Sequence, residues 1–190
     1  MIFEKISNLN FHERKGEEEL SQRVASLLKK IQDKYDQHQI KHAPYVVIKA
    51  DAGTYGMGIM IAKSPEDVLS LNRKKRNKMS VIKEGVKVSE VIIQEGIHTE
   101  EHIDGAVTEP VIYMIDHFVI GGFYRVHTAK GKDENLNAPG MHFIPQPFET
   151  SCLMPDQGRP CDDEANRFYA YGVIARLALI AAARELEIKS

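Results

Sequence analysis

The sequence has few cysteines, no signal-peptide core and no long apolar run, and each of these absences excludes a class of protein. Its two cysteines, Cys152 and Cys161, are separated by eight residues, a spacing that matches no zinc site and is too sparse for a disulfide scaffold. Charged residues interrupt the first ten positions, and no run approaches the roughly 18 apolar residues of a membrane span. We therefore expect a cytoplasmic protein without a membrane segment.

The sequence also lacks a strong charge of either sign. Lys and Arg number 25 and Asp and Glu 27, giving a net charge of −2, so no global field favours nucleic acid as a partner. Hydrophobic residues make up 43% of the 190 residues, which is enough for a proper core. At roughly 100 to 200 residues per domain, this length allows one domain and a subdomain.

Three segments are predicted to be helical. Apolar residues at three- and four-residue spacings, with acidic residues at the start, predict a helix over residues 17–37. Ser64-Pro65-Glu66-Asp67 predicts a helix start, with the serine as cap, and a helix that continues to about Met79. The alanine- and leucine-rich stretch over residues 163–187 predicts a long, mostly buried helix.

The predicted strands lie between these helices and form hairpins. β-Branched runs predict strands at residues 45–50, 59–62, 91–94, 111–115 and 118–126, and residues 127–162 are predicted to be an ordered loop. Hairpins between helices indicate an α+β fold in which antiparallel hairpin sheets pack with helices, and not a doubly wound parallel sheet.

The sharpest candidate site is the lysine strand with the loop that follows it. Its loop residues are Gly53, Thr54, Tyr55, Gly56, Met57 and Gly58. Glycines permit the close backbone approach that a phosphate cradle needs, and Lys49 in an apolar strand should meet an anion or solvent. The alternative is an edge strand with a solvated lysine and an ordinary glycine-rich turn.

A second candidate site is the end of the strand at Gln94-Glu95-Gly96-Ile97. The backbone donor and acceptor of an exposed strand end can pair with an adenine edge without any particular side chain. Taken alone, the pattern is weak, and a strand end that simply leaves the core is the favoured interpretation.

A third candidate site combines a strand arginine with a polar loop. Arg125 offers a planar fork that suits phosphate or carboxylate. The hard oxygen donors that Mg²⁺ prefers follow within a few residues, and of these we select Glu134 and Asn137 as metal ligands, with Asn135 between them. The alternative is a polar surface loop with an arginine-carboxylate pair.

Taken in order, these three sites resemble the nucleotide site of ATP-grasp enzymes, in which ATP lies between two sheets. The stretch over residues 111–140 is similar to bacterial glutathione synthetases. Four longer motifs resemble the proteobacterial ATP-grasp type of glutamate-cysteine ligase, at residues 48–60, 122–129, 133–143 and 166–172.

The resemblance implies the first step of glutathione synthesis. ATP would phosphorylate the side-chain carboxylate of glutamate, and the amine of cysteine would attack the acyl phosphate to give γ-glutamylcysteine, ADP and phosphate. Lys49 and Arg125 would neutralise phosphate charge, Asn135 would lie by the γ-phosphate, the glycine loop would close over it, and Mg²⁺ would bridge phosphate oxygens.

The resemblance also implies an incomplete enzyme. It divides the chain into an N-terminal helical segment at 1–44, a small ATP-grasp subdomain at 45–97 and part of the large subdomain at 98–190. The family's N-terminal region would be missing, or supplied by a partner chain. The alternatives are a nucleotide-binding fragment without catalysis alone, or another ATP-grasp ligase similar to glutathione synthetase.

Overall fold

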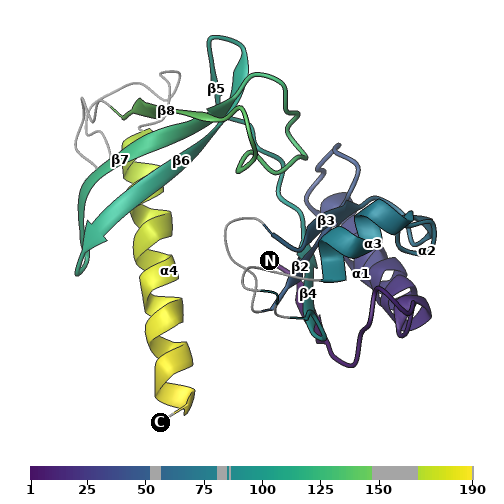
Figure 1. The fold of residues 1–190 in the computed structure, drawn as a ribbon. Helices are drawn as coiled ribbons and strands as arrows, with labels where there is room; N and C mark the ends of the chain where they lie inside the picture. The colour runs from purple at the N-terminus through teal and green to yellow at the C-terminus, as the bar shows by residue number, and fades with distance from the viewer. Residues whose placement is uncertain (52–56, 81–84, 86, 147–166, 190) are drawn as a thin grey trace. The chain divides into compact units, whose positions relative to one another are not determined.

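A computed structural model of the chain describes residues 1–51, 57–80, 85, 87–146 and 167–189. The chain divides into two compact units (Figure 1). The first unit comprises Met1–Thr99 and Gly131–Ala138, and the second comprises Glu100–Lys130 and Pro139–Ser190. The first unit thus joins residues 1–99 to a short segment from later in the chain, residues 131–138.

The first unit contains a four-stranded antiparallel sheet in the order β1-β4-β2-β3. Its strands are β1 (Phe3–Ile6), β2 (Val46–Ala50), β3 (Ile59–Ala62) and β4 (Val91–Glu95). The predicted hairpin of β2 and β3 is confirmed, with Lys49 opposite Ile59. Strand β1 has no counterpart among the predicted strands, and it pairs with the distant β4.

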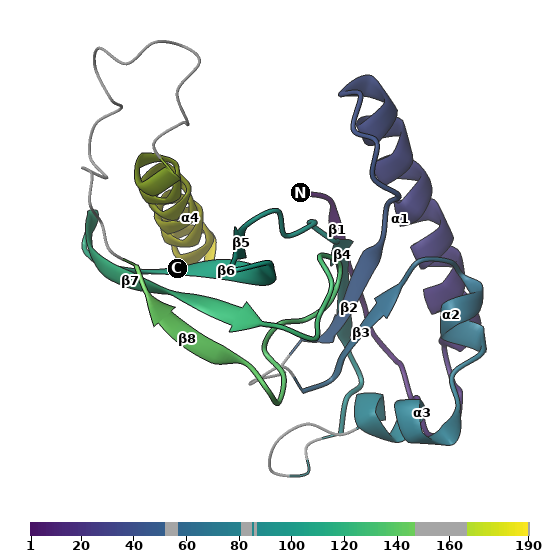
Figure 2. The same ribbon diagram turned by 90° about the horizontal axis from the view of Figure 1, so that it is seen from above.

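Helix α1 (Glu17–Gln37) covers one face of this sheet (Figure 2) and confirms the predicted range. It buries Leu20, Val24, Leu27 and Ile31 completely, at the spacing that predicted the helix. Because strand side chains alternate between faces, Val46, Ile48 and Ala50 of β2 face α1 and are buried. Val47 and Lys49 therefore lie on the opposite face.

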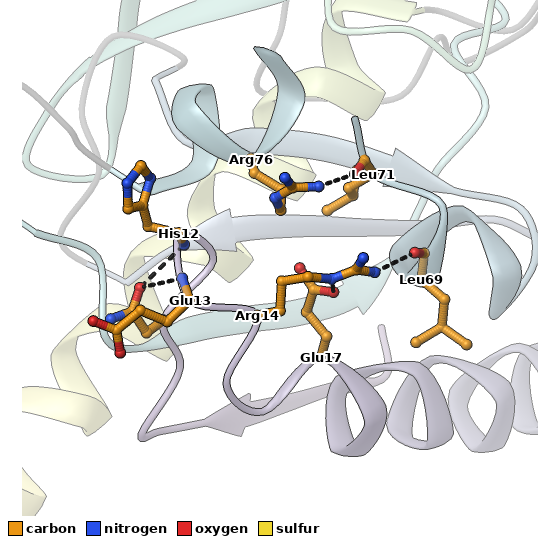
Figure 3. Close-up of polar contacts among 8 residues, drawn as sticks. His12, Glu13, Arg14, Glu17, Leu69, Leu71 and Arg76 are labelled. Atoms are coloured by element: carbon orange, nitrogen blue, oxygen red, sulfur yellow. Dashed lines mark hydrogen bonds and ion pairs between the residues drawn. The ribbon is translucent and has the colours of Figure 1, made fainter. Parts of the chain in front are cut away.

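The single helix predicted from Ser64 to Met79 is wrong, because the structure has two helices, α2 (Glu66–Leu69) and α3 (Arg73–Ser80). Arg14 donates to the carbonyl of Leu69, and Arg76 donates to the carbonyl of Leu71 (Figure 3). These bonds satisfy carbonyls that a continuous helix would have used itself.

Side-chain carboxylate and amide oxygens accept the backbone donors at the starts of these two helices. The side chain of Asn72 caps α3 by accepting from the backbone N–H of Lys75. The Ser64 side chain makes no capping bond, and the Asp67 carboxylate accepts from the backbone N–H groups of Lys63 and Ser64 instead.

The second unit contains a four-stranded antiparallel sheet in the order β5-β6-β7-β8, with helix α4 (Arg167–Lys189). Its strands are β5 (His102–Ile103), β6 (Ala106–Ile115), β7 (Phe118–His127) and β8 (His142–Pro145). The predicted hairpin of β6 and β7 is confirmed and is longer than expected. Strand β8 lies within the stretch predicted as loop, since its pairing with β7 is non-local.

Helix α4 confirms the predicted C-terminal helix from Arg167 onward, but the prediction that it is mostly buried is wrong. Its buried side chains lie in its first turns, and every residue from Leu177 to Glu187 is exposed. Residues 163–166 of the predicted helix, and both cysteines, lie outside the described residues. No helix in the described part of the chain is long and apolar enough to cross a lipid bilayer.

Candidate nucleotide site

Lys49 and Gln94 share one face of the first sheet, the face opposite α1. Val47 pairs with Gln94 and Lys49 pairs with Ile92, and directly opposed residues in antiparallel strands point to the same side. We call the surface formed by Val47, Lys49, Ile92 and Gln94 the outer face; all four side chains are half-buried. The lysine strand and the strand end therefore present the side chains of Lys49 and Gln94 to one surface.

Two lysines lie in one row across this face, and their surroundings differ. Lys5 on β1 and Lys49 on β2 both pair with Ile92 of β4. The ammonium of Lys5 lies 2.7 Å from Asp51 and 2.8 Å from Glu90, and hydrogen bonds to these carboxylates raise its pKa. Within the described ranges, the half-buried Lys49 has no carboxylate partner. Of the two lysines in this row, Lys49 is thus the one without an ion pair to a described residue.

The side chain of Glu95 faces the opposite way, toward α1. It is 1% exposed, and its carboxylate accepts from Lys34 Nζ at 2.8 and 3.0 Å and from the backbone N–H of Ile2 at 3.1 Å. Two further donors at this strand end are engaged, since the N–H of Glu95 bonds Ile2 and that of Gly96 bonds Tyr45. The Glu95 side chain therefore holds the strand end in place and does not reach the outer face.

Two tyrosines fix the backbone just beyond β4. Tyr45 donates to the carbonyl of Ile97 at 2.6 Å, and Tyr35 donates to the carbonyl of Gly96 at 3.4 Å. A Cβ at position 96 would lie 2.0 Å from the Tyr45 ring, so only glycine fits there. Sequence reasoning missed Tyr45, Tyr35 and Lys34, because their partners lie 52 to 61 residues away.

We expect Tyr45→Phe to loosen this strand end. Loss of one hydrogen bond costs about 1 kcal/mol of stability and leaves the carbonyl of Ile97 without its donor. Amide hydrogen exchange at residues 97–99 should accelerate, and Tyr35→Phe, which removes a longer bond, should have a smaller effect. Unchanged protection at residues 97–99 would show that the hydroxyl does not position this segment.

The segment 131–138 belongs to the first unit. Leu136 is fully buried, the N–H of Thr99 bonds the carbonyl of Lys132, and Lys63 pairs with Asp133. The hydrogen bond from Lys63 lowers the pKa of the Asp133 carboxyl. Because the pKa of Asp133 is lowered in the folded chain, the ion pair stabilises the fold at pH values above the ordinary aspartate pKa. This stabilisation is lost as the pH falls through the lowered pKa. It is small, because the Lys63 side chain is 64% exposed.

Within this segment, Asn135 forms a local turn by accepting the N–H of Asn137 through its side-chain oxygen at 3.0 Å. Among the described residues, its amide nitrogen has no acceptor. The Glu134 carboxylate accepts the N–H of Gly131 at 2.8 Å through one oxygen. Glu134 and Asn137 supply hard oxygen donors, which suit Mg²⁺ when substrate phosphates complete its shell. In the described part of the chain, no three His, Cys, Asp or Glu side chains are grouped to hold a metal ion.

Arg125 lies in the second unit, on the sheet face opposite α4. Its neighbours Tyr124 and Val126 belong to the buried cluster with Tyr171 of α4, so Arg125 points to the other side with Glu109. One guanidinium nitrogen donates to Glu109 at 3.1 Å, and the buried Nε has no hydrogen-bond partner. The side chain is 25% exposed, so this arginine retains donor capacity toward a ligand.

A buried histidine fixes the loop that follows the Asn segment. His127 is 4% exposed; its Nδ1 accepts the N–H of Ala129, and its Nε2 bonds the carbonyl of Pro139 at 3.1 Å. Gly140 adopts a φ of 99° against this ring. Sequence reasoning did not select His127, although it follows Arg125 by two residues and shares its face.

Part of the glycine-rich loop can be placed. Gly58 adopts a φ of 64° and its carbonyl accepts from the N–H of Ala50 at 2.9 Å, so it closes the hairpin, and Met57 is 39% exposed. The other selected loop residues, Gly53, Thr54, Tyr55 and Gly56, lie outside the described residues. Lys49, the strand end and the Asn segment thus belong to one unit, and Arg125 to the other.

Comparison with known proteins identifies the class to which this fold and these side chains belong. Residues 1–186 match a family model of ligases, enzymes that here form a carbon–nitrogen bond. The chain belongs to this family, GshA, glutamate-cysteine ligase. This membership agrees with the family implied by the sequence motifs.

A solved structure supports the same assignment. The chain is similar to a proposed gamma-glutamylcysteine synthetase from Methylobacillus flagellatus KT, with 62% identity and a TM-score of 0.83. The match covers 100% of this chain and 45% of that protein, so this chain spans less than half the length of its relative. No curated protein sequence matches the chain.

Proposed function

We propose that this chain is the nucleotide-binding part of an ATP-dependent glutamate-cysteine ligase with an ATP-grasp fold. In the proposed reaction, the glutamate side-chain carboxylate attacks the γ-phosphorus of ATP, forming an acyl phosphate and releasing ADP. The amine of cysteine then attacks the acyl carbon, and phosphate leaves. Membership of the glutamate-cysteine ligase family and the geometry of the outer face support this proposal.

The single observation that carries the proposal is the environment of Lys49. Lys49 is a half-buried residue on the outer face, close in sequence to a glycine-rich loop, and among the described residues it has no carboxylate partner, whereas Lys5 in the same row has two. Partial burial of a cation costs free energy unless an anion pairs with it. The phosphates of ATP are suitable anions, and the glycine loop would cover them.

The adenine is proposed to lie beside Gln94 and Ile97. The N–H groups of Glu95 and Gly96 already bond within the unit, whereas Ile97 is 61% exposed and the Gln94 side chain lies on the outer face. Of the four residues selected from the sequence, Glu95 and Gly96 would act by fixing the position of Ile97. The bond from Tyr45 to the carbonyl of Ile97 serves the same purpose.

The remaining groups are proposed to neutralise and orient the transferred phosphate. The fork of Arg125 suits phosphate oxygens, and the amide nitrogen of Asn135 can donate to the γ-phosphate. Glu134 and Asn137 would hold Mg²⁺, which supplies further charge neutralisation when bound. No protein nucleophile is needed, because the chemistry depends on positioning and electrostatics.

We expect Mg-ATP to stabilise the chain in a thermal-shift experiment. At one hundred times its dissociation constant, a ligand that binds only the folded state adds about 2.7 kcal/mol. Lys49→Met should weaken ATP affinity roughly 10- to 100-fold, since a hydrogen bond to a charged group contributes about 1.5–3 kcal/mol. Isothermal titration calorimetry with a non-hydrolysable ATP analogue provides the affinities.

The matched control is Lys29→Met, which removes an exposed lysine from α1 and should leave the affinity unchanged. Absence of a thermal shift at millimolar Mg-ATP, or equal affinities for the two variants, would contradict the proposed site and favour a fragment that does not bind nucleotide. We further propose that the complete enzyme acts in the cytoplasm on small molecules only, namely glutamate, cysteine and ATP.

A further inference from the structure

Helix α4 presents apolar side chains to solvent over most of its length. Five of them, Ile174, Leu177, Leu179, Ile180 and Leu186, are between 42% and 71% exposed. At 100° per residue these positions are distributed around the helix and do not form one stripe. A helix that is hydrophobic on all sides normally lies within a protein core.

The helix is anchored to its own sheet only near its start. Phe168 is buried, and Tyr171 donates to Glu101 at 2.6 Å while its ring packs on Tyr124. Burial and the hydrogen bond to Glu101 raise the pKa of Tyr171. Beyond Leu177 the helix extends away from β6 and β7 (Figure 1), and at about 1.5 Å per residue its exposed part is roughly 16 Å long.

The hairpin of β6 and β7 in the same unit carries a second exposed apolar group. Around its turn, Tyr113, Ile115, Phe118 and Ile120 are 54%, 64%, 51% and 59% exposed. Contiguous exposed groups of this kind are uncommon on a monomer and mark interaction sites. Tyr113 and Ile115 follow Glu109 by four and six residues on β6 and therefore lie on its face, opposite α4, so the hairpin group is separate from the helix. We call the exposed apolar residues of α4 alone the apolar surface.

We propose that the apolar surface binds the rest of a glutamate-cysteine ligase polypeptide, the portion that corresponds to the part of the Methylobacillus flagellatus protein outside the match. This proposal rests on family membership and not on the nucleotide site. The match includes all of this chain but only 45% of that protein, so more than half of the related chain has to pack outside the matched part. The exposed helix offers what such an interface requires, a rigid element with large aliphatic side chains.

We favour the remaining ligase polypeptide over a second copy of this chain as the binding partner, because more than half of the related protein lies outside the match. A homodimer would cover α4 with an identical fragment and would leave the larger part of the related ligase without this surface. The interface should therefore be heterologous, with α4 inserted among apolar side chains of the remaining ligase polypeptide.

The test is co-expression of this chain, carrying an affinity tag, with the unmatched portion of the Methylobacillus flagellatus protein as a separate chain. We expect capture of a 1:1 complex, measured by size-exclusion chromatography with light scattering. The variant with Leu177→Glu and Ile180→Glu should bind at least about a hundredfold more weakly, since it removes two apolar side chains from the interface. Hydroxyl-radical footprinting should show Leu177 and Ile180 protected only in the complex.

The matched control is Leu69→Glu, which places the same charge at an apolar residue of α2 that is 42% exposed in the first unit. It should leave capture unchanged, and circular dichroism should show native helix content for both variants. Absence of capture, equal capture by the double glutamate variant, or a homodimer that the double variant dissociates would each overturn the proposal.

Discussion

Glu95→Ala is expected to lower the free energy of unfolding by about 3 kcal/mol, at the lower end of the range for breaking a buried ion pair. The carboxylate is 1% exposed, and its removal leaves Lys34 and the backbone N–H of Ile2 without their acceptor. Lys34 is 35% exposed and can regain water, which limits the loss. Urea unfolding followed by circular dichroism gives the change in midpoint and slope.

Two further variants separate the charge from the hydrogen bonds. Glu95→Gln keeps an acceptor for Lys34 and Ile2, so we expect a smaller loss of about 1–2 kcal/mol. Glu4→Ala removes a carboxylate that pairs at 2.8 Å with the 53% exposed Lys30, and a surface pair contributes about 1 kcal/mol or less. If Glu95→Ala proved no more destabilising than Glu4→Ala, Glu95 would not anchor the strand end.

Arg125→Ala is expected to reduce the turnover of a ligase completed with the remaining polypeptide by about 10²- to 10³-fold. This is the usual effect of removing one group that stabilises charge developing in a transition state. The partly buried guanidinium has one carboxylate neighbour, Glu109, and a buried Nε without a partner, so its loss removes charge that water does not replace. Steady-state kinetics with glutamate, cysteine and Mg-ATP measure kcat and KM separately.

Two control variants accompany Arg125→Ala: one keeps a positive charge at position 125, and the other removes an exposed arginine elsewhere. Arg125→Lys keeps a cation but loses the planar fork, so it should recover only part of the activity. Arg73→Ala removes an exposed arginine from α3 and should leave kcat unchanged. A normal kcat for Arg125→Ala would assign this arginine to the ion pair with Glu109 alone.

Short sequence patterns correctly predicted the helices and strands that are determined by residues close together in the sequence. The apolar spacing of α1 and the β-branched run of β2 need no distant partner, and both were found where the sequence placed them. The break between α2 and α3 depends in part on Arg14, which bonds a carbonyl 55 residues away. Strand β1 depends on pairing with β4, so no short window could reveal either feature.

The candidate site shows the same limit. The sequence patterns selected Lys49 and Gln94 on separate grounds, and the strand register places them on one face. The patterns could not show that Glu95 points the other way, because Lys34 approaches it from 61 residues away in the sequence. The burial expected for α4 followed from its alanine- and leucine-rich composition and is wrong for most of the helix, because composition alone does not show whether a neighbouring element covers it.

The place of Leu136 has a consequence for the order in which the chain folds during synthesis. This side chain is fully buried and its segment belongs to the first unit, yet it follows strands β6 and β7 of the second unit in the chain. A nascent chain released only as far as Thr99 therefore lacks one of the buried side chains of the first unit. The first unit is complete only after most of the second sheet has left the ribosome, so the two units mature together and not in simple succession.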